Sequence, residues 1–133
     1  MSKKQTVVFD FDGVIHSYVS GWQGINQTPD PPVQGIKEAI DAIRIAGYEV
    51  VVVSTRCGYV DGRIAVTNYL RQHNIIVDRV ESEKPPAIVY IDDRAICFEG
   101  DASTLLHQIQ NFQPWYKKVH KVSVKTTADT ETT

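Results

Sequence analysis

Residues 6–14 read TVVFDFDGV, a short apolar run that ends in two aspartates and a glycine. β-Branched and aromatic residues make up most of this run, and that composition is typical of a buried strand. The strand is therefore predicted to carry Asp10 and Asp12 at its carboxyl end. Because these aspartates are two positions apart, their side chains lie on the same side of a regular strand. Gly13 then allows the backbone to turn sharply.

Two further apolar runs, residues 48–54 (YEVVVVS) and residues 87–91 (AIVYI), are also predicted strands. A continuous apolar run of this length is typical of a parallel strand that is covered on both sides. Polar side chains again follow each strand directly. They are Ser54, Thr55, Arg56, Asp92 and Asp93.

Helices separate the strands. Apolar positions recur at three- and four-residue steps in the first helical segment, and Gly47 is suited to end it. Asp61 is predicted to cap the second helix. The predicted helices span residues 33–46, 61–72 and 102–112, and two weaker strands span residues 75–80 and 96–98.

This alternation of strands and helices predicts an α/β protein with a three-layer Rossmann-like fold. We expect a mostly parallel open sheet with helices on both faces. Such sheets bind ligands at the carboxyl ends of their strands, so the polar residues named above are expected to meet at one edge. A single domain is predicted over residues 1–122, followed by a polar, disordered tail over residues 123–133.

Composition and charge narrow the class of protein only slightly. Of the 133 residues, 42% are hydrophobic and 23% are charged, as in ordinary globular proteins. The net charge of -2 gives no broad positive field for nucleic acid. The N-terminal region has no apolar stretch of signal-peptide or spanning length, so we expect a cytoplasmic protein without membrane contact. The two cysteines are expected to be reduced, with Cys97 more buried than Cys57.

The four aspartates predict a cation site. Carboxylates gathered in one small region repel one another, and a divalent cation would neutralise them. Oxygen ligands favour Mg²⁺ over zinc. Calcium-binding loops also begin with spaced aspartates, but residues 14–18 (VIHSY) lack the further oxygen ligands of such loops.

The segment Asp10-Phe11-Asp12-Gly13 after a hydrophobic strand resembles the DxDGx signature of the haloacid dehalogenase superfamily of phosphohydrolases. Residues that resemble the family's other three motifs follow in the same order. They are Ser54, Lys84 and the pair Asp92-Asp93, which comes directly after residues 87–91. The resemblance covers residues 6 to about 112. It implies the haloacid dehalogenase fold, and the short intervals between the motifs leave no room for a separate cap domain.

The resemblance implies a Mg²⁺-dependent phosphatase that hydrolyses a phosphate monoester through an aspartyl-phosphate intermediate. In this scheme Asp10 attacks phosphorus, and Asp12 protonates the departing oxygen and then activates water. Ser54 and Lys84 would stabilise the phosphoryl oxygens.

The same resemblance gives the expected ligands of Mg²⁺. They are the Asp10 carboxylate, the backbone carbonyl of Asp12, and Asp93 or Asp92, with Asp93 preferred as the direct ligand.

Some assignments stay open on the sequence alone. Thr55 is close enough to Ser54 to be the residue of the second motif, and it is a candidate substrate-binding residue. Arg56 is another, because it can bind a phosphate bidentately, but it can equally pair with a nearby acid. A lone histidine such as His16 is more often structural.

The loop over residues 17–34 is rich in Gly, Pro, Asn and Ser and is a candidate substrate flap. On it, Trp22 either touches substrate or packs the flap down.

The expected partner is a phosphorylated substrate, either a small molecule or a macromolecule, and oligomerisation is compatible with an open site. Residues 115–121 (WYKKVHK) combine aromatic and basic side chains, although a solvated tail is the simpler interpretation. Two alternatives remain. One is a binding module that uses the same fold to hold a metal or a phosphorylated partner without turnover. The other is a nucleic-acid end phosphatase.

Overall fold

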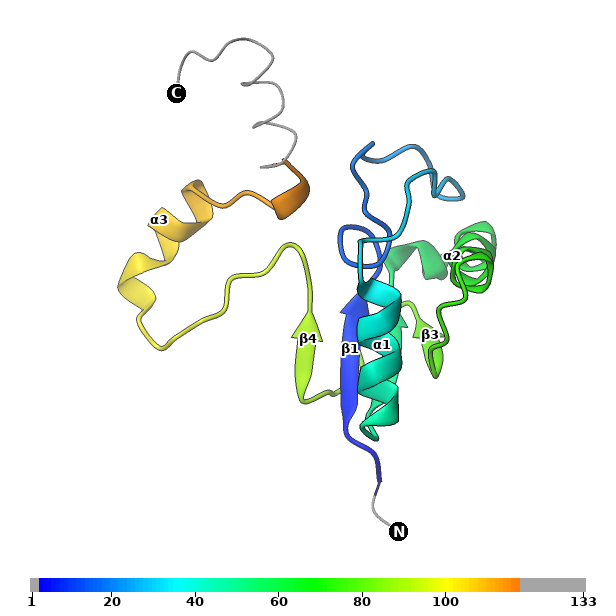
Figure 1. Cartoon of the computed structure of the whole chain (residues 1–133). Helices are drawn as coiled ribbons and strands as arrows, with labels where there is room; N and C mark the ends of the chain where they lie inside the picture. The colour runs from blue at the N-terminus through cyan, green and yellow to red at the C-terminus, as the bar shows by residue number, and fades with distance from the viewer. Residues whose placement is uncertain (1–2, 118–133) are drawn as a thin grey trace. The chain divides into compact units, whose positions relative to one another are not determined.

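The computed structural model describes residues 3–117 (Figure 1). The chain divides into two compact units, Met1–Asp92 and Asp93–Thr133. The predicted tail at residues 123–133, and most of the basic and aromatic run at residues 115–121, lie outside the described residues.

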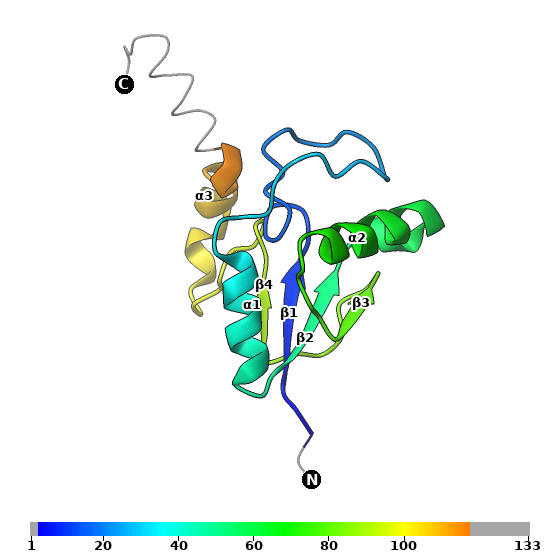
Figure 2. The same ribbon diagram turned by 45° about the vertical axis from the view of Figure 1, so that its right-hand side comes forward.

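A four-stranded parallel sheet forms the centre of the first unit (Figure 2). Its order is β3-β2-β1-β4, and all three pairings are parallel. In the register, Phe9 lies between Val52 on one side and Ile91 on the other. This confirms the predicted α/β class with an open parallel sheet. The strands are β1 (Thr6–Asp10), β2 (Glu49–Val53), β3 (Arg79–Glu81) and β4 (Val89–Ile91).

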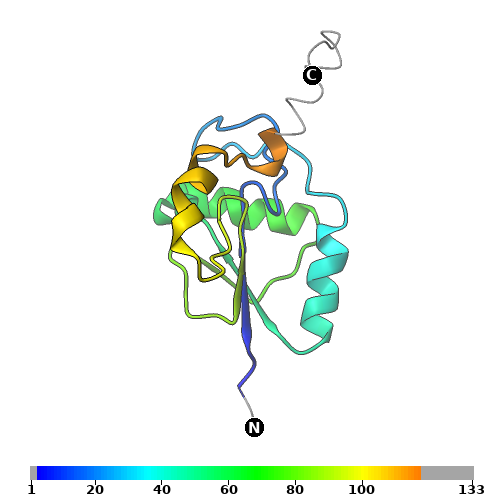
Figure 3. The same ribbon diagram turned by 90° about the vertical axis from the view of Figure 1, so that its left-hand side faces the viewer.

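Two helices connect the first three strands. Helix α1 (Ile36–Ile45) joins β1 to β2, and α2 (Val60–Gln72) joins β2 to β3. Both crossovers step across the sheet in the same direction, and right-handed crossovers of this kind place their helices on the same face. Figure 3 shows α1 to one side of β1.

An apolar cluster lies on each face of the sheet, as a three-layer arrangement requires. On one face, strand and helix residues form a single buried cluster that includes Val7, Phe9, Val50, Val52, Ile40, Val66, Tyr69 and Leu70. The opposite face buries Val8, Val51 and Val53, and Ala87 packs against them. Ala87 belongs to the link between β3 and β4, so this link contacts the second face.

Some predicted elements differ from the structure. Asp61 lies in the first turn of α2, and Tyr59 occupies the N-cap without a side-chain bond. The helix begins there because a 3₁₀ turn, η1 (Thr55–Gly58), already directs the chain into it. Residues 96–98 form no strand. The prediction that Cys97 is more buried than Cys57 was wrong, because Cys57 is buried in η1 whereas Cys97 is exposed.

In the second unit, a short 3₁₀ turn, η2 (Ala102–Thr104), precedes helix α3 (Leu105–Gln110). Asp101 caps η2 by accepting a hydrogen bond from the backbone N–H of Ser103. The predicted helix at residues 102–112 is therefore shorter and begins as a 3₁₀ turn. Among the described residues, no helix has both the length and the apolar character needed to cross a membrane.

Candidate active site

Strands β1 and β4 are neighbours and both end in acid. Strand β1 ends at Asp10, and Asp92 follows the last residue of β4. The chain leaves β1 towards β2 on one side and returns to β4 on the other, so the direction of chain connection reverses between β1 and β4. In open α/β sheets, ligands bind at the carboxyl ends of strands at such a reversal.

Three carboxylates gather at this point. Asp10, Asp92 and Asp93 each offer one oxygen, and these oxygens lie within 4.8 Å of one another. The donor set consists of carboxylate oxygens alone, which fits a hard divalent cation such as Mg²⁺. The Asp12 carboxylate is not part of this group and has other partners.

Lys84 lies beside the acidic cluster. Its ammonium donates a hydrogen bond of 3.0 Å to Asp92 Oδ2 and lies 5.6 Å from the centre of the Tyr90 ring. The hydroxyl of Tyr90 in turn donates to the backbone carbonyl of Pro85, which fixes the link next to Lys84. The lysine side chain is 51% exposed, so its charge is accessible from solvent.

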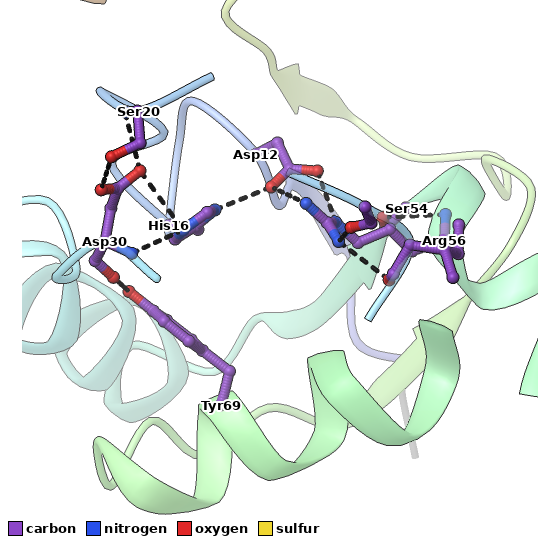
Figure 4. Close-up of polar contacts among 9 residues, drawn as sticks. Asp12, His16, Ser20, Asp30, Ser54, Arg56 and Tyr69 are labelled. Carbon is purple, nitrogen blue, oxygen red and sulfur yellow. Dashed lines mark hydrogen bonds and ion pairs between the residues drawn. The ribbon is translucent and has the colours of Figure 1, made fainter. Parts of the chain in front are cut away.

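Asp12 is held at both carboxylate oxygens (Figure 4). Arg56 donates from Nε to Oδ2 over 2.8 Å and from Nη2 to Oδ1 over 3.2 Å. His16 Nδ1 lies 2.8 Å from Oδ1. Burial raises the pKa of Asp12, but the hydrogen bonds from His16 and Arg56 lower it by more than burial raises it. The net pKa is therefore below the ordinary value. Asp12 is therefore ionised at neutral pH.

Arg56 is buried, with 1% of its surface exposed. Besides Asp12, it binds the loop, because Nη1 donates to the backbone carbonyls of Gly24 and Ile25 over 2.8 Å each. The centre of the Trp22 ring lies 4.6 Å from the guanidinium carbon of Arg56. Of the two alternatives open for Arg56, the ion pair with a nearby acid is present in the structure. A buried guanidinium needs such partners for its donors.

His16 connects Asp12 to the far end of the same loop. It is 0% exposed, and its Nε2 accepts a 3.1 Å hydrogen bond from the backbone N–H of Asp30. The Asp30 carboxylate accepts bonds from the backbone N–H and the hydroxyl of Ser20. The Tyr69 hydroxyl on α2 donates to the Asp30 carbonyl over 2.8 Å. Nothing in the sequence spacing indicated that His16 and Asp30 would meet.

The candidate flap is thus anchored at several points. Near its base, the Ser17 N–H donates to the Pro31 carbonyl, and the Val33 N–H donates to the Ile15 carbonyl. Its middle is held by Arg56. Trp22 packs on that arginine and remains 55% exposed.

Ser54 and Thr55 lie at the carboxyl end of β2. Ser54 is buried, and its hydroxyl accepts a 3.2 Å bond from the backbone N–H of Arg56, so that it caps η1. A hydroxyl that accepts one bond can still donate another. Thr55 is exposed. Both residues remain candidates for the second motif.

Comparisons with known proteins show the fold but not the activity. No family model matches the sequence, and no curated protein matches it. A solved chain in the Pnkp1/Rnl/Hen1 complex is similar in structure, with a TM-score of 0.51 and 15% identity over 85% of this chain and 37% of that chain. A second, in the Pnkp1/Rnl/Hen1 RNA repair complex, has a TM-score of 0.49 and 14% identity over 84% of this chain and 35% of that one. This chain spans just over a third of the length of each.

Proposed function

We propose that this protein is a Mg²⁺-dependent phosphatase that hydrolyses a phosphate monoester through an aspartyl-phosphate on Asp10. The observation that carries the proposal is the gathering of Asp10, Asp92 and Asp93 at the carboxyl ends of β1 and β4. Asp10 and Asp92 are more than eighty positions apart in sequence, and the parallel sheet brings them together.

The three carboxylates are the residues that would hold Mg²⁺, together with the backbone carbonyl of Asp12. When bound, the cation would neutralise charge on the phosphoryl group and on the attacking carboxylate. Lys84 adds a positive charge at the same edge of the sheet through its contact with Asp92. The hydroxyl of Ser54 or Thr55 would donate a hydrogen bond to a phosphoryl oxygen.

The reaction has two steps. In the first, an oxygen of Asp10 bonds to phosphorus while the ester P–O bond breaks, and the departing oxygen takes a proton from Asp12. In the second, a water oxygen bonds to phosphorus, its proton passes to Asp12, and the bond from phosphorus to Asp10 breaks. Inorganic phosphate leaves, and Asp10 is restored.

Asp12 suits the second step directly, because its hydrogen bonds with His16 and Arg56 favour the ionised carboxylate that a base requires. The first step needs the same carboxyl in its protonated form. A phosphate dianion bound beside Asp12 would favour that form, since a neighbouring like charge raises the pKa of a carboxyl.

A phosphatase screen tests this proposal. The protein is incubated with 4-nitrophenyl phosphate and a panel of phosphorylated metabolites, with and without Mg²⁺, beside an Asp10→Asn control. We expect phosphate release that requires both the metal and Asp10. A phosphoenzyme trapped by acid quench, absent from the Asp10→Asn variant, would identify the covalent step.

If no substrate gives release that depends on both Mg²⁺ and Asp10, the proposal fails. Calorimetric binding of Mg²⁺ without any turnover would then favour the alternative of a non-catalytic binding module.

Nucleic-acid ends form a second arm of the screen. The structural neighbour with a TM-score of 0.51 is a chain of the Pnkp1/Rnl/Hen1 complex, but similarity at 15% identity transfers only the fold and leaves the substrate open. Oligonucleotides with a 3′- or a 5′-phosphate are therefore compared with the small esters at equal phosphate concentration. A preference of at least tenfold for either end would define a macromolecular substrate.

A further inference from the structure

We infer that His16 is a positioning residue, which holds the Asp12 carboxylate in the orientation needed for proton transfer to the leaving group. This inference rests on the proposed function and adds a residue to it. It starts from three features of His16, namely its complete burial, its two ring-nitrogen partners and its contact with Asp12.

The partners of His16 define its tautomer. A backbone N–H can only donate, so Nε2, which receives the Asp30 N–H, must be the acceptor nitrogen. The proton of the neutral ring then resides on Nδ1, which donates to Asp12 Oδ1. The nearest Asp30 carboxylate oxygen is 3.7 Å from Nε2, too far for a hydrogen bond that would favour a doubly protonated ring.

The imidazole ring is held in place by its surroundings. It stacks on Phe11 with ring centres 5.6 Å apart and planes inclined by 18°. The edge of the Tyr69 ring packs against it at 5.3 Å, and the Tyr69 hydroxyl fixes the carbonyl of the same Asp30 that sets the tautomer. The segment just after strand β1, the loop and helix α2 thus all hold the donor.

The hydrogen bonds to Asp12 are distributed unequally. Within residues 3–117, Oδ1 accepts from both His16 and Arg56, whereas Oδ2 accepts from Arg56 alone. A carboxylate oxygen has about two lone-pair positions, so Oδ1 is filled and Oδ2 keeps one position for a proton. His16 therefore makes Oδ2 the oxygen that exchanges protons with the leaving group and with water.

Three variants separate positioning from mere folding. His16→Asn keeps an N–H donor close to the place of Nδ1, His16→Gln places its amide closer to Nε2, and His16→Leu removes both. Their activity is compared on 4-nitrophenyl phosphate, whose leaving group needs little protonation, and on an alkyl phosphate, whose leaving group needs a proton. Thermal unfolding of each variant shows whether it is folded at the assay temperature.

We expect His16→Leu to lower kcat on the alkyl ester by about 100-fold, the usual scale of general acid catalysis, with a much smaller loss on the aryl ester. His16→Asn should recover most of the alkyl activity, and His16→Gln should not. Equal losses on the two esters in folded variants, or better rescue by His16→Gln than by His16→Asn, would overturn the inference.

A second measurement does not depend on turnover. Nitrogen-15 NMR of the imidazole, assigned by loss of its signals in His16→Asn, reports which nitrogen carries the proton. We expect protonated Nδ1 and unprotonated Nε2 at neutral pH, and the opposite tautomer or a doubly protonated ring would refute the inference. If this tautomer is found but the wild-type protein hydrolyses no phosphate ester, the proposed function fails while the geometry stands.

Discussion

Arg56 Nε donates a 2.8 Å hydrogen bond to Asp12 Oδ2, joining two residues that are 44 positions apart. The same guanidinium binds the carbonyls of Gly24 and Ile25 and is almost completely buried. One side chain therefore links the segment just after strand β1, the turn after β2 and the middle of the loop.

Removing this arginine is expected to destabilise the protein strongly. In Arg56→Met the Asp12 carboxylate keeps its His16 contact but loses the guanidinium. Breaking a buried ion pair costs about 3–5 kcal/mol, and we expect the lower end of that range because Asp12 is 21% exposed. Chemical denaturation measures the loss of unfolding free energy. Adding Asp12→Asn removes the stranded charge, so the double variant should lose less than the sum of the two single losses.

Arg63→Met is the matched control, because Arg63 is exposed and its guanidinium donates to the Val80 carbonyl. We expect a loss within about 1 kcal/mol. Equal losses for the two arginine variants would contradict the structural role assigned to Arg56.

The backbone of Arg56 depends on Gly62 in the first turn of α2. A Cβ at position 62 would overlap the Arg56 carbonyl oxygen, so Gly62→Ala forces the helix away from η1. Overpacking of this kind costs about 1–3 kcal/mol, more than the roughly 1 kcal/mol by which alanine favours a helix over glycine. We expect a lower melting temperature and a loss of Asp12-dependent activity.

Gly58→Ala tests the same turn without the clash. A Cβ there meets no atom within 4 Å. The free energy of unfolding of Gly58→Ala should be unchanged or rise by up to about 1 kcal/mol, because alanine restricts the unfolded chain. A Gly58→Ala variant as unstable as Gly62→Ala would show that the turn tolerates no side chain for another reason.

The sequence allowed the acidic cluster to be predicted because parallel strands have a simple geometry. Once residues 6–11 and 87–91 are recognised as strands, Asp10 and Asp92 must lie at the same edge of the sheet. Lys84 was named through the resemblance to the third motif of the haloacid dehalogenase superfamily, and it does contact Asp92. The apolar pattern and the strand direction were enough for Asp10 and Asp92.

The environment of Asp12 could not be predicted in this way. Its partner His16 is oriented by Asp30, fourteen residues away in a loop that has no periodicity. Arg56 had two chemically reasonable partners, and only tertiary structure could decide between them. Cys97 was expected to be more buried than Cys57, but residues 96–98 form no strand and the Cys97 side chain is exposed.

The acidic cluster should bind Mg²⁺ with an affinity that depends on Asp10 and Asp92. Each supplies an oxygen to the group, so Asp10→Asn and Asp92→Asn are each expected to weaken binding at least tenfold in calorimetric titrations. Asp41→Asn is the control, because Asp41 pairs with Lys37 on α1 and is not in the cluster. Unchanged affinity in both cluster variants would place the cation elsewhere.

Asp78 is expected to make the first unit sensitive to acid. Its carboxylate accepts hydrogen bonds from Arg44 at the end of α1 and from the backbone N–H of Val50 in β2. Burial raises the pKa of Asp78, but these two hydrogen bonds lower it by more than burial raises it. The net pKa is therefore below the ordinary value of about 3.9. The folded state therefore prefers the ionised form more strongly than the unfolded state does.

The sign of the pH effect follows from this preference. The stabilisation from Asp78 is complete above the unfolded pKa, and it disappears as the pH falls through the lower pKa of the folded state. Because the Asp78 side chain is 24% exposed, we expect it to contribute only about 1 kcal/mol to the free energy of unfolding at pH 7. Urea denaturation should show Asp78→Asn less stable than wild type at pH 7 and nearly equal to it near the acid limit.

The exposed pair of Asp41 with Lys37 contributes little, so Asp41→Asn should follow the wild-type curve more closely. A stability difference for Asp78→Asn that grows as the pH falls would mean that Asp78 is more easily protonated in the folded state, contrary to the direction given by its hydrogen bonds.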